Sequence, residues 1–285
     1  MRILWHRVIG VLLLAALLVV GVIVLVRFID YRMAQREYEE YAAMQEASEA
    51  ATISVPTPTA AWTETPAPTQ YAVAIPANSA TPVPTATTLP TAEPFYSERI
   101  QKLKKQNKDT IGFIEVPDTD VQYPVVQGKD NEYYMTHTFA KKRRAAGAIF
   151  LDAWNSAELT DFNSVIYGHN MKDGSMFALL REYRHPDFLR NHKYIEVTLL
   201  HSHKTYKVFS AYIAEEDVDF RGFGCDSAKE KAEFIKQITY RSEIDTNATA
   251  TEDDHILTLV TCTSGERDRF WIVHAVLVED VNTKQ

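Results

Sequence analysis

Thr258-Leu259-Val260-Thr261-Cys262 is a run of β-branched and apolar residues that ends in a thiol. This pattern predicts a buried strand whose last position is the cysteine. Thr263-Ser264-Gly265-Glu266 has the composition of a loop, and Phe270-Trp271-Ile272-Val273 then predicts a second strand with Arg269 at its start. The sequence therefore predicts a thiol and a guanidinium at the facing ends of two neighbouring strands. A nucleophile beside a fixed positive charge suits acyl transfer.

A base for such a thiol is predicted at His169. Ser164-Val165-Ile166-Tyr167 indicates a short strand, and we expect Gly168 to let the backbone turn so that His169 lies at the strand's end. There the imidazole can reach a thiol carried by another strand. His274 is the rival base, but it lies inside a strand after an apolar run, which favours a packing role.

Taken together, these residues resemble the signature of the sortases, the cysteine transpeptidases of Gram-positive cell surfaces. Three further segments are similar to class B sortases in particular: 123–131 (YPVVQGKDN), 147–152 (GAIFLD) and 167–173 (YGHNMKD). The resemblance covers about residues 95–280. It implies that Cys262 is the nucleophile, His169 the general acid and base, and Arg269 the group that stabilises the oxyanion. It implies no metal and no other cofactor.

The resemblance also implies a substrate groove. Tyr167, Asn131, Met135 and Thr261 occupy positions that contact or adjoin the sorting signal in the family. Met135 stands where relatives commonly carry Leu, and Val260 stands where they often carry Ser. The sorting motif that this chain reads therefore stays open.

Turn residues divide the part of the chain after residue 95 into short β-branched segments, which is typical of an all-β sandwich or barrel. The resemblance implies a mainly-β fold, an eight-stranded barrel with an N-terminal helix and a helix between strands six and seven. The expected helices are 96–107, 175–183 and 227–240, and the expected strands are 110–116, 121–126, 148–151, 164–167, 194–200, 205–213, 255–261 and 270–278.

The N-terminal part predicts a membrane anchor and a spacer. Residues 8–26 form an apolar run long enough to cross a bilayer as a helix, and the alternative is a cleaved signal peptide. Residues 27–52 are expected as a juxtamembrane helical segment, and the resemblance implies that residues 1–7 lie in the cytoplasm and that 95–285 form an extracellular catalytic domain. Residues 53–94 hold nine of the chain's 12 prolines and predict a disordered Thr/Pro-rich linker. We expect its reach to set how far into the cell wall the domain works.

Composition excludes several classes of function. A net charge of −8 and a pI of about 5.6 argue against a nucleic-acid partner. Two cysteines exclude a disulfide framework and a thiolate zinc cluster. Cys225 lies in a loop in which no catalytic neighbours are expected. His201 and His203 are two residues apart, but no third metal ligand is evident.

The predicted function is that of a membrane-bound sortase, single-pass, acting on secreted proteins that carry a sorting signal. The expected acceptor is an amine of a peptidoglycan precursor or of a pilin, so a class B enzyme that polymerises pilins is one alternative. A non-catalytic wall-spanning module with the sortase fold is another. A cysteine endopeptidase would differ only in using water as the acceptor, and the sequence does not separate the two.

Overall fold

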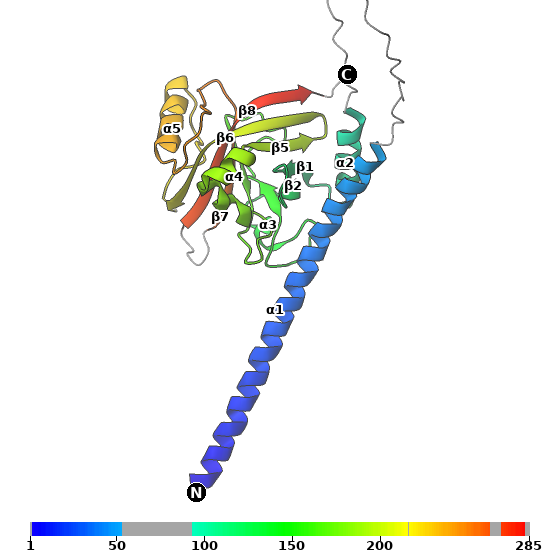
Figure 1. Ribbon diagram of the computed structural model, residues 1–285. Coiled ribbons are helices and arrows are strands. Elements are labelled where there is room, and N and C mark those ends of the chain that lie inside the picture. Colours follow the sequence, from blue (N-terminus) through cyan, green and yellow to red (C-terminus); the bar gives the residue numbers. More distant parts are fainter. Residues whose placement is uncertain (1, 53–92, 216, 263–268, 283–285) are drawn as a thin grey trace, which may run out of the picture.

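The structure, a computed structural model, describes residues 2–52, 93–215, 217–262 and 269–282. A β-barrel is joined to one long N-terminal helix that projects well beyond it (Figure 1). In chain order the elements are α1 (Arg2–Thr52), α2 (Glu93–Gln106), β1 (Thr110–Glu115), β2 (Gln122–Gln127), α3 (Tyr133–Thr136), β3 (Ile149–Leu151), β4 (Asn163–Tyr167), the 3₁₀ helix η1 (Ala178–Arg184), α4 (Pro186–Asn191), β5 (Tyr194–Leu199), β6 (Ser202–Glu215), α5 (Ala228–Tyr240), β7 (Ile256–Cys262) and β8 (Arg269–Asn282).

The eight strands form a closed barrel in the order β1-β2-β3-β4-β7-β8-β6-β5. The β2–β3 and β4–β7 pairs are parallel, and the other pairs are antiparallel. Closure leaves no unpaired edge strand, which suits strands this short. The prediction of a mainly-β, eight-stranded barrel is confirmed, and α5 lies between β6 and β7 as expected.

Strand β7 is buried on both faces, which explains its nearly continuous apolar sequence. Leu257 and Leu259 pack in the main core inside the barrel. Ile256 and Val260 point the other way, into a second cluster that includes Phe234, Ile235 and Ile238 of α5. The period-two alternation of a strand thus supplies two cores from one segment.

The helices differ more from the sequence prediction than the strands do. Helix α5 begins where expected, because Ser227 and Glu230 form a capping box at its N-terminus. The helix expected over 175–183 is instead the 3₁₀ helix η1, and α3 and α4 were not predicted. Both are short, at four and six residues, and so carry too few positions to show a helical period.

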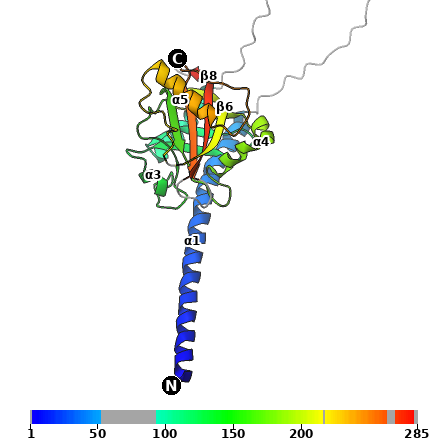
Figure 2. The same ribbon diagram turned by 90° about the vertical axis from the view of Figure 1, so that its left-hand side faces the viewer.

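Helix α1 has two parts with different surroundings. Residues Val11–Ile29 expose their apolar side chains and project away from the barrel, and α1 is long and apolar enough to cross a membrane (Figures 1 and 2). The part after Ile29 lies against the barrel, where Ala34, Glu37 and Tyr38 are buried. The Tyr38 hydroxyl donates to the carbonyl oxygen of Gly147 at 2.6 Å. The predicted span 8–26 lies within α1, whereas most of the predicted linker, 53–92, lies outside the described residues.

Candidate active site

The parallel pairing of β4 and β7 brings the predicted base and the predicted nucleophile to the same end of the barrel. Tyr167 pairs with Val260, and the Gly168 amide donates to the Val260 carbonyl at 3.1 Å. His169 and Cys262 each follow this pair by two residues. The backbone of Cys262 ends β7, while its side chain lies outside the described part of the structure.

Arg269 opens β8 on the other side of β7. The antiparallel register pairs Cys262 with Phe270, so Arg269 lies one residue from the position opposite the cysteine. Its side chain is exposed. The structure therefore gathers the backbones of the three predicted catalytic residues at one end of three adjacent strands, β4, β7 and β8.

Gly168 is needed for a reason other than the one expected from the sequence. Its φ is not positive, so the position demands no left-handed backbone. A Cβ atom there would instead lie 2.4 Å from Ile149 Cδ1 and 2.7 Å from Phe177 Cδ2. Because Gly168 has no side chain, its backbone packs directly on the core. This packing fixes the position of the His169 backbone, from which the imidazole extends.

His169 is half-buried, and its ring is held by the backbone of α3. Nε2 lies 2.8 Å from the carbonyl oxygen of Met135. A carbonyl can only accept, so Nε2 carries the proton and, in the neutral ring, Nδ1 is left able to accept another. Burial lowers the pKa of His169 below its ordinary value, against the opposing effect of the Met135 hydrogen bond. The imidazole is therefore mostly neutral near pH 7 and able to act as a base.

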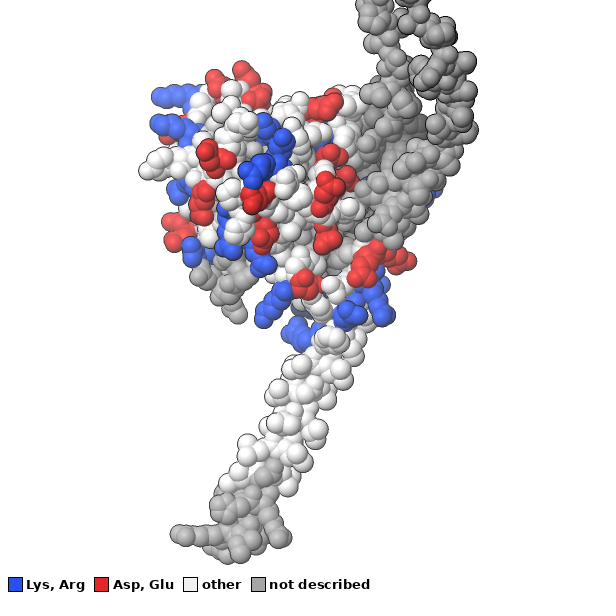
Figure 3. All heavy atoms as spheres, in the orientation of Figure 1, with Lys and Arg blue, Asp and Glu red and all other residues white. Residues whose placement is uncertain are grey.

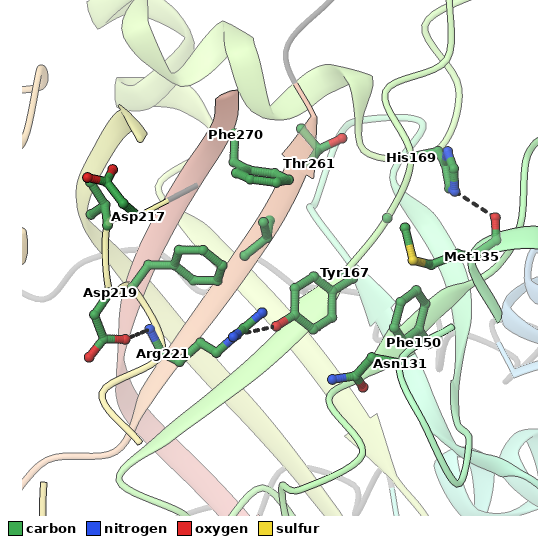
Figure 4. Close-up of a pocket in the computed structure, with 14 residues that line it drawn as sticks. Asn131, Met135, Phe150, Tyr167, His169, Asp217, Asp219, Arg221, Thr261 and Phe270 are labelled. Atoms are coloured by element: carbon green, nitrogen blue, oxygen red, sulfur yellow. Dashed lines mark hydrogen bonds between the residues drawn. The ribbon is translucent and has the colours of Figure 1, made fainter. Parts of the chain in front are cut away.

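A cavity of about 400 Å³ opens beside His169 (Figure 4). It brings together five of the residues predicted from the sequence: Asn131, Met135, Tyr167, His169 and Thr261. The remaining wall consists of Phe150, Gly168, Asp217, Val218, Asp219, Phe220, Arg221, Val260 and Phe270. The volume and the mix of aromatic and polar groups are typical of a ligand-binding pocket.

A chain of hydrogen bonds organises the polar side of this cavity. Arg221 Nε donates to the Tyr167 hydroxyl at 3.0 Å, and that hydroxyl donates to Asp152 Oδ2 at 2.9 Å. Asn131 Nδ2 donates to the same carboxylate oxygen at 2.9 Å. Burial, with the Asp152 charge nearby, raises the pKa of Tyr167 above its ordinary value, so the hydroxyl stays protonated and can donate. Asp152 thus fixes both Asn131 and Tyr167 relative to each other.

Sequence reasoning missed Asp152 and Arg221. Asp152 ends the segment 147–152, so the signal for it was present, but its burial was not foreseeable from position alone. Arg221 lies in the loop that also holds Cys225. The expectation that this loop has no catalytic neighbours is wrong, since Asp219, Phe220 and Arg221 all line the cavity. No local pattern in the sequence indicated that the loop folds over β4.

The rival histidine His274 is structural. It is fully buried, with Nδ1 2.8 Å from Thr258 Oγ1 and Nε2 3.1 Å from the Tyr212 hydroxyl. The Thr258 hydroxyl already donates to Asn163 Oδ1, so it must accept from Nδ1–H. Burial lowers the pKa of His274 to about 3. A neutral, fully bonded imidazole remote from the cavity does not serve as its base.

Within the described ranges, no group of three or more His, Cys, Asp or Glu side chains is arranged to hold a metal ion. His203, considered above as half of a metal pair, instead contacts Thr198 Oγ1 at 3.0 Å and Glu196 at 3.5 Å.

Comparisons with known proteins agree with this geometry. The family model for the sortase domain matches residues 114–278. Sortase B of Listeria monocytogenes is 34% identical over 165 residues, which is 58% of this chain and 67% of that protein. Sortase B of Staphylococcus aureus is 32% identical over 164 residues, 58% of this chain and 67% of that protein.

Solved structures give the same result. The Staphylococcus aureus sortase B–substrate complex superimposes with a TM-score of 0.61 at 30% sequence identity, over 64% of this chain and 86% of that one. A mutant form of Clostridium perfringens sortase B gives a TM-score of 0.61 at 28% identity, over 66% and 90% of the two chains. The region matched by the family model contains the whole barrel apart from most of β1 and the end of β8. The chain belongs to the sortase family, and within that family it is a class B sortase.

Proposed function

We propose that this protein is a membrane-anchored cysteine transpeptidase that cleaves a C-terminal sorting signal and joins the secreted protein to a cell-wall amine. The observation that carries the proposal is the register of β4 and β7, from which His169 and Cys262 each follow by two residues. Family membership supports it, as does the solved complex of a Staphylococcus aureus relative with its substrate.

In the proposed reaction, the Cys262 thiol gives its proton to His169 and the sulfur attacks a backbone carbonyl carbon of the sorting signal. The peptide C–N bond breaks, the leaving amine takes the proton from His169, and the acyl group remains as a thioester. An acceptor amine then attacks the thioester carbon and gives a proton to His169 as the C–S bond breaks. Since Nε2–H bonds the Met135 carbonyl, Nδ1 is the nitrogen that exchanges these protons.

Arg269 stabilises the oxyanion in both steps, a role that suits a guanidinium because it remains charged. The signal peptide occupies the cavity lined by Asn131, Met135, Tyr167 and Thr261. In the cell, residues 1–7 lie in the cytoplasm, α1 crosses the membrane, and the barrel lies outside.

The test uses the full chain in detergent, because α1 contributes buried side chains to the barrel. Quenched peptides with LPxTG-like and NPxTN-like motifs are offered with and without triglycine. We expect cleavage by the parent chain, an amine-dependent ligated product, and loss of both in Cys262→Ala. Cys225→Ala is the matched control and should retain activity, because that thiol does not line the cavity.

The outcomes separate the alternatives. Ligation to a pilin-derived lysine peptide in preference to triglycine would favour a pilin-polymerising enzyme. Cleavage without ligation to any amine would favour an endopeptidase. If no peptide is cut and Cys262 resists alkylation, the non-catalytic module becomes the better explanation and the proposal fails.

A further inference from the structure

Helix α1 is joined to the barrel by specific contacts rather than by a flexible connection. The Tyr38 hydroxyl accepts from the Phe139 amide at 3.3 Å as well as donating to Gly147. Glu37 Oε1 accepts from the Ala140 amide at 3.1 Å. The Tyr38 and Tyr123 rings pack edge to face at 5.5 Å. These contacts all fall within the loop before β3 or on β2, so they hold one face of the barrel against α1.

The same contacts place the loop before β3 beside the end of the apolar part of α1. The exposed apolar side chains of α1 continue to Ile29, and Asp30 is the first charged residue after Arg27. Asp30 pairs with Arg144, which lies in the loop before β3. Seven residues on, or about 10 Å along a helix, Glu37 pairs with Lys142. The loop therefore lies alongside the first two turns of α1 beyond its apolar part.

That loop carries four consecutive basic residues, Lys141-Lys142-Arg143-Arg144. Arg144 is mostly buried by Asp30, but the other three are exposed. Arg32 and Arg36 of α1 are also exposed. Basic side chains line the lower edge of the barrel where α1 leaves it (Figure 3).

Three acidic groups pair with this basic run, namely Asp30, Glu37 and Asp109, and Glu39 and Glu40 of α1 are exposed close by, so the positive charge is offset only in part. Lys142 is 61% exposed and 3.7 Å from Glu37. Lys141 is 45% exposed and 2.8 Å from Asp109. Arg143, Arg32 and Arg36 add three further positive charges to the same edge. The surface therefore keeps a net positive charge.

We infer that this surface, Lys141, Lys142 and Arg143 together with Arg32 and Arg36, binds the headgroups of anionic phospholipids in the membrane that α1 spans. A chain with a net charge of −8 would otherwise be repelled by such a membrane. Basic groups at the level of the headgroups lie within one Debye length of the lipid charge, where each strengthens association about fivefold. The inference rests on α1 spanning the membrane and not on the chemistry of the cavity.

The experiment measures lysine acylation by mass spectrometry on the full chain in nanodiscs of phosphatidylcholine, with or without phosphatidylglycerol. Lys142 is the reporter. Lys236 of α5 is the matched control in the same sample, since it is 77% exposed and 3.5 Å from Glu233. Helix α5 lies far from the apolar part of α1 in both views (Figures 1 and 2).

We expect phosphatidylglycerol to slow acylation of Lys142 by about fivefold, to leave Lys236 unchanged, and to lose its effect in high salt. The variant with Lys141→Gln and Arg143→Gln should weaken the lipid effect on Lys142. Equal changes at Lys142 and Lys236 would overturn the inference. Soluble polyphosphate that protects Lys142 equally well in neutral discs would replace lipid with a phosphate polymer as the partner, which also overturns it. A chain that stays out of the discs would overturn the membrane span as well.

Discussion

The Tyr167 hydroxyl joins the loop carrying Arg221 to the buried Asp152 carboxylate. Tyr167→Phe removes that hydroxyl and leaves the ring, which packs against Phe150 with centroids 5.2 Å apart. The substitution therefore tests the hydrogen bonds without opening a cavity in the core. Tyr240→Phe is the matched control, because Tyr240 is 91% exposed.

The magnitude follows from what each partner loses. A hydrogen bond to a charged group contributes about 1.5–3 kcal/mol when its partner stays buried. Asp152 is 1% exposed, but it keeps the Asn131 Nδ2 and Trp154 amide donors, so its loss is near the lower end of that range. Arg221 is exposed and regains water, so its loss is smaller. We expect the free energy of unfolding to fall by about 2–3 kcal/mol.

Two measurements check this. Urea denaturation of the full chain gives the unfolding free energy, and cleavage of the best quenched peptide gives kcat/KM. We expect kcat/KM to fall about tenfold, mainly through KM, because Tyr167 and Asn131 lose their common alignment on Asp152. An unfolding free energy within about 0.5 kcal/mol of the parent, as expected for Tyr240→Phe, would refute the reasoning about the hydrogen-bond chain.

Three further substitutions have defined outcomes. Tyr38→Phe removes the hydroxyl between α1 and the barrel and should lower the unfolding free energy by about 1–2 kcal/mol in urea; no change would mean that α1 is not docked as described. Gly168→Ala should cost about 1–3 kcal/mol and most of the peptide cleavage, since its Cβ would meet Ile149 at 2.4 Å; full activity would show that the core yields easily. His274 has a folded-state pKa of about 3, below its ordinary 6.5, so its contribution to stability is complete above pH 6.5 and is lost towards pH 3 at about 1.4 kcal/mol per pH unit. Between pH 7 and pH 5, the unfolding free energy of His274→Gln in urea titrations should therefore fall by about 2 kcal/mol less than that of the parent. Parallel plots of unfolding free energy against pH would contradict this assignment.

The strands were largely predictable from the sequence because their signal is local. A strand such as β7, which is buried on both faces, can be recognised from its own nearly continuous apolar sequence. The ends of β6 and β8 were underestimated: β6 runs over Ser202–Glu215 and β8 over Arg269–Asn282. Most of the residues beyond the predicted bounds are polar, and the two strands pair with each other from Ser202 and Asn282 at one end to Glu215 and Arg269 at the other. Polar strand ends are stabilised by backbone pairing, which side-chain patterns do not reveal.

The same distinction between local signals and tertiary contacts applies to the residues of the candidate site. His169 and Cys262 were identified because each stands at the end of a recognisable strand. Arg221 was not, because its place beside Tyr167 depends on the path of the loop after β6. Asp152 lies in a recognisable segment, 147–152, but its role arises only when Asn131 and Tyr167 both reach its carboxylate. Such roles come from tertiary contacts and have no periodic signature.

The docking of α1 changes what the Thr/Pro-rich segment 53–92 can do for the protein. The segment begins only after α1 has packed on the barrel through Tyr38, and it leads into α2, whose Ile100 and Leu103 are buried in the same core. Both of its ends are therefore anchored to one body. With α1 crossing the membrane as proposed, the length of this segment would not set the height of the cavity above the bilayer, and the few helical residues between Ile29 and Tyr38 would set it instead. Such an enzyme would act at a fixed distance from the membrane surface. Its substrates and acceptors would therefore have to approach the membrane to reach the cavity.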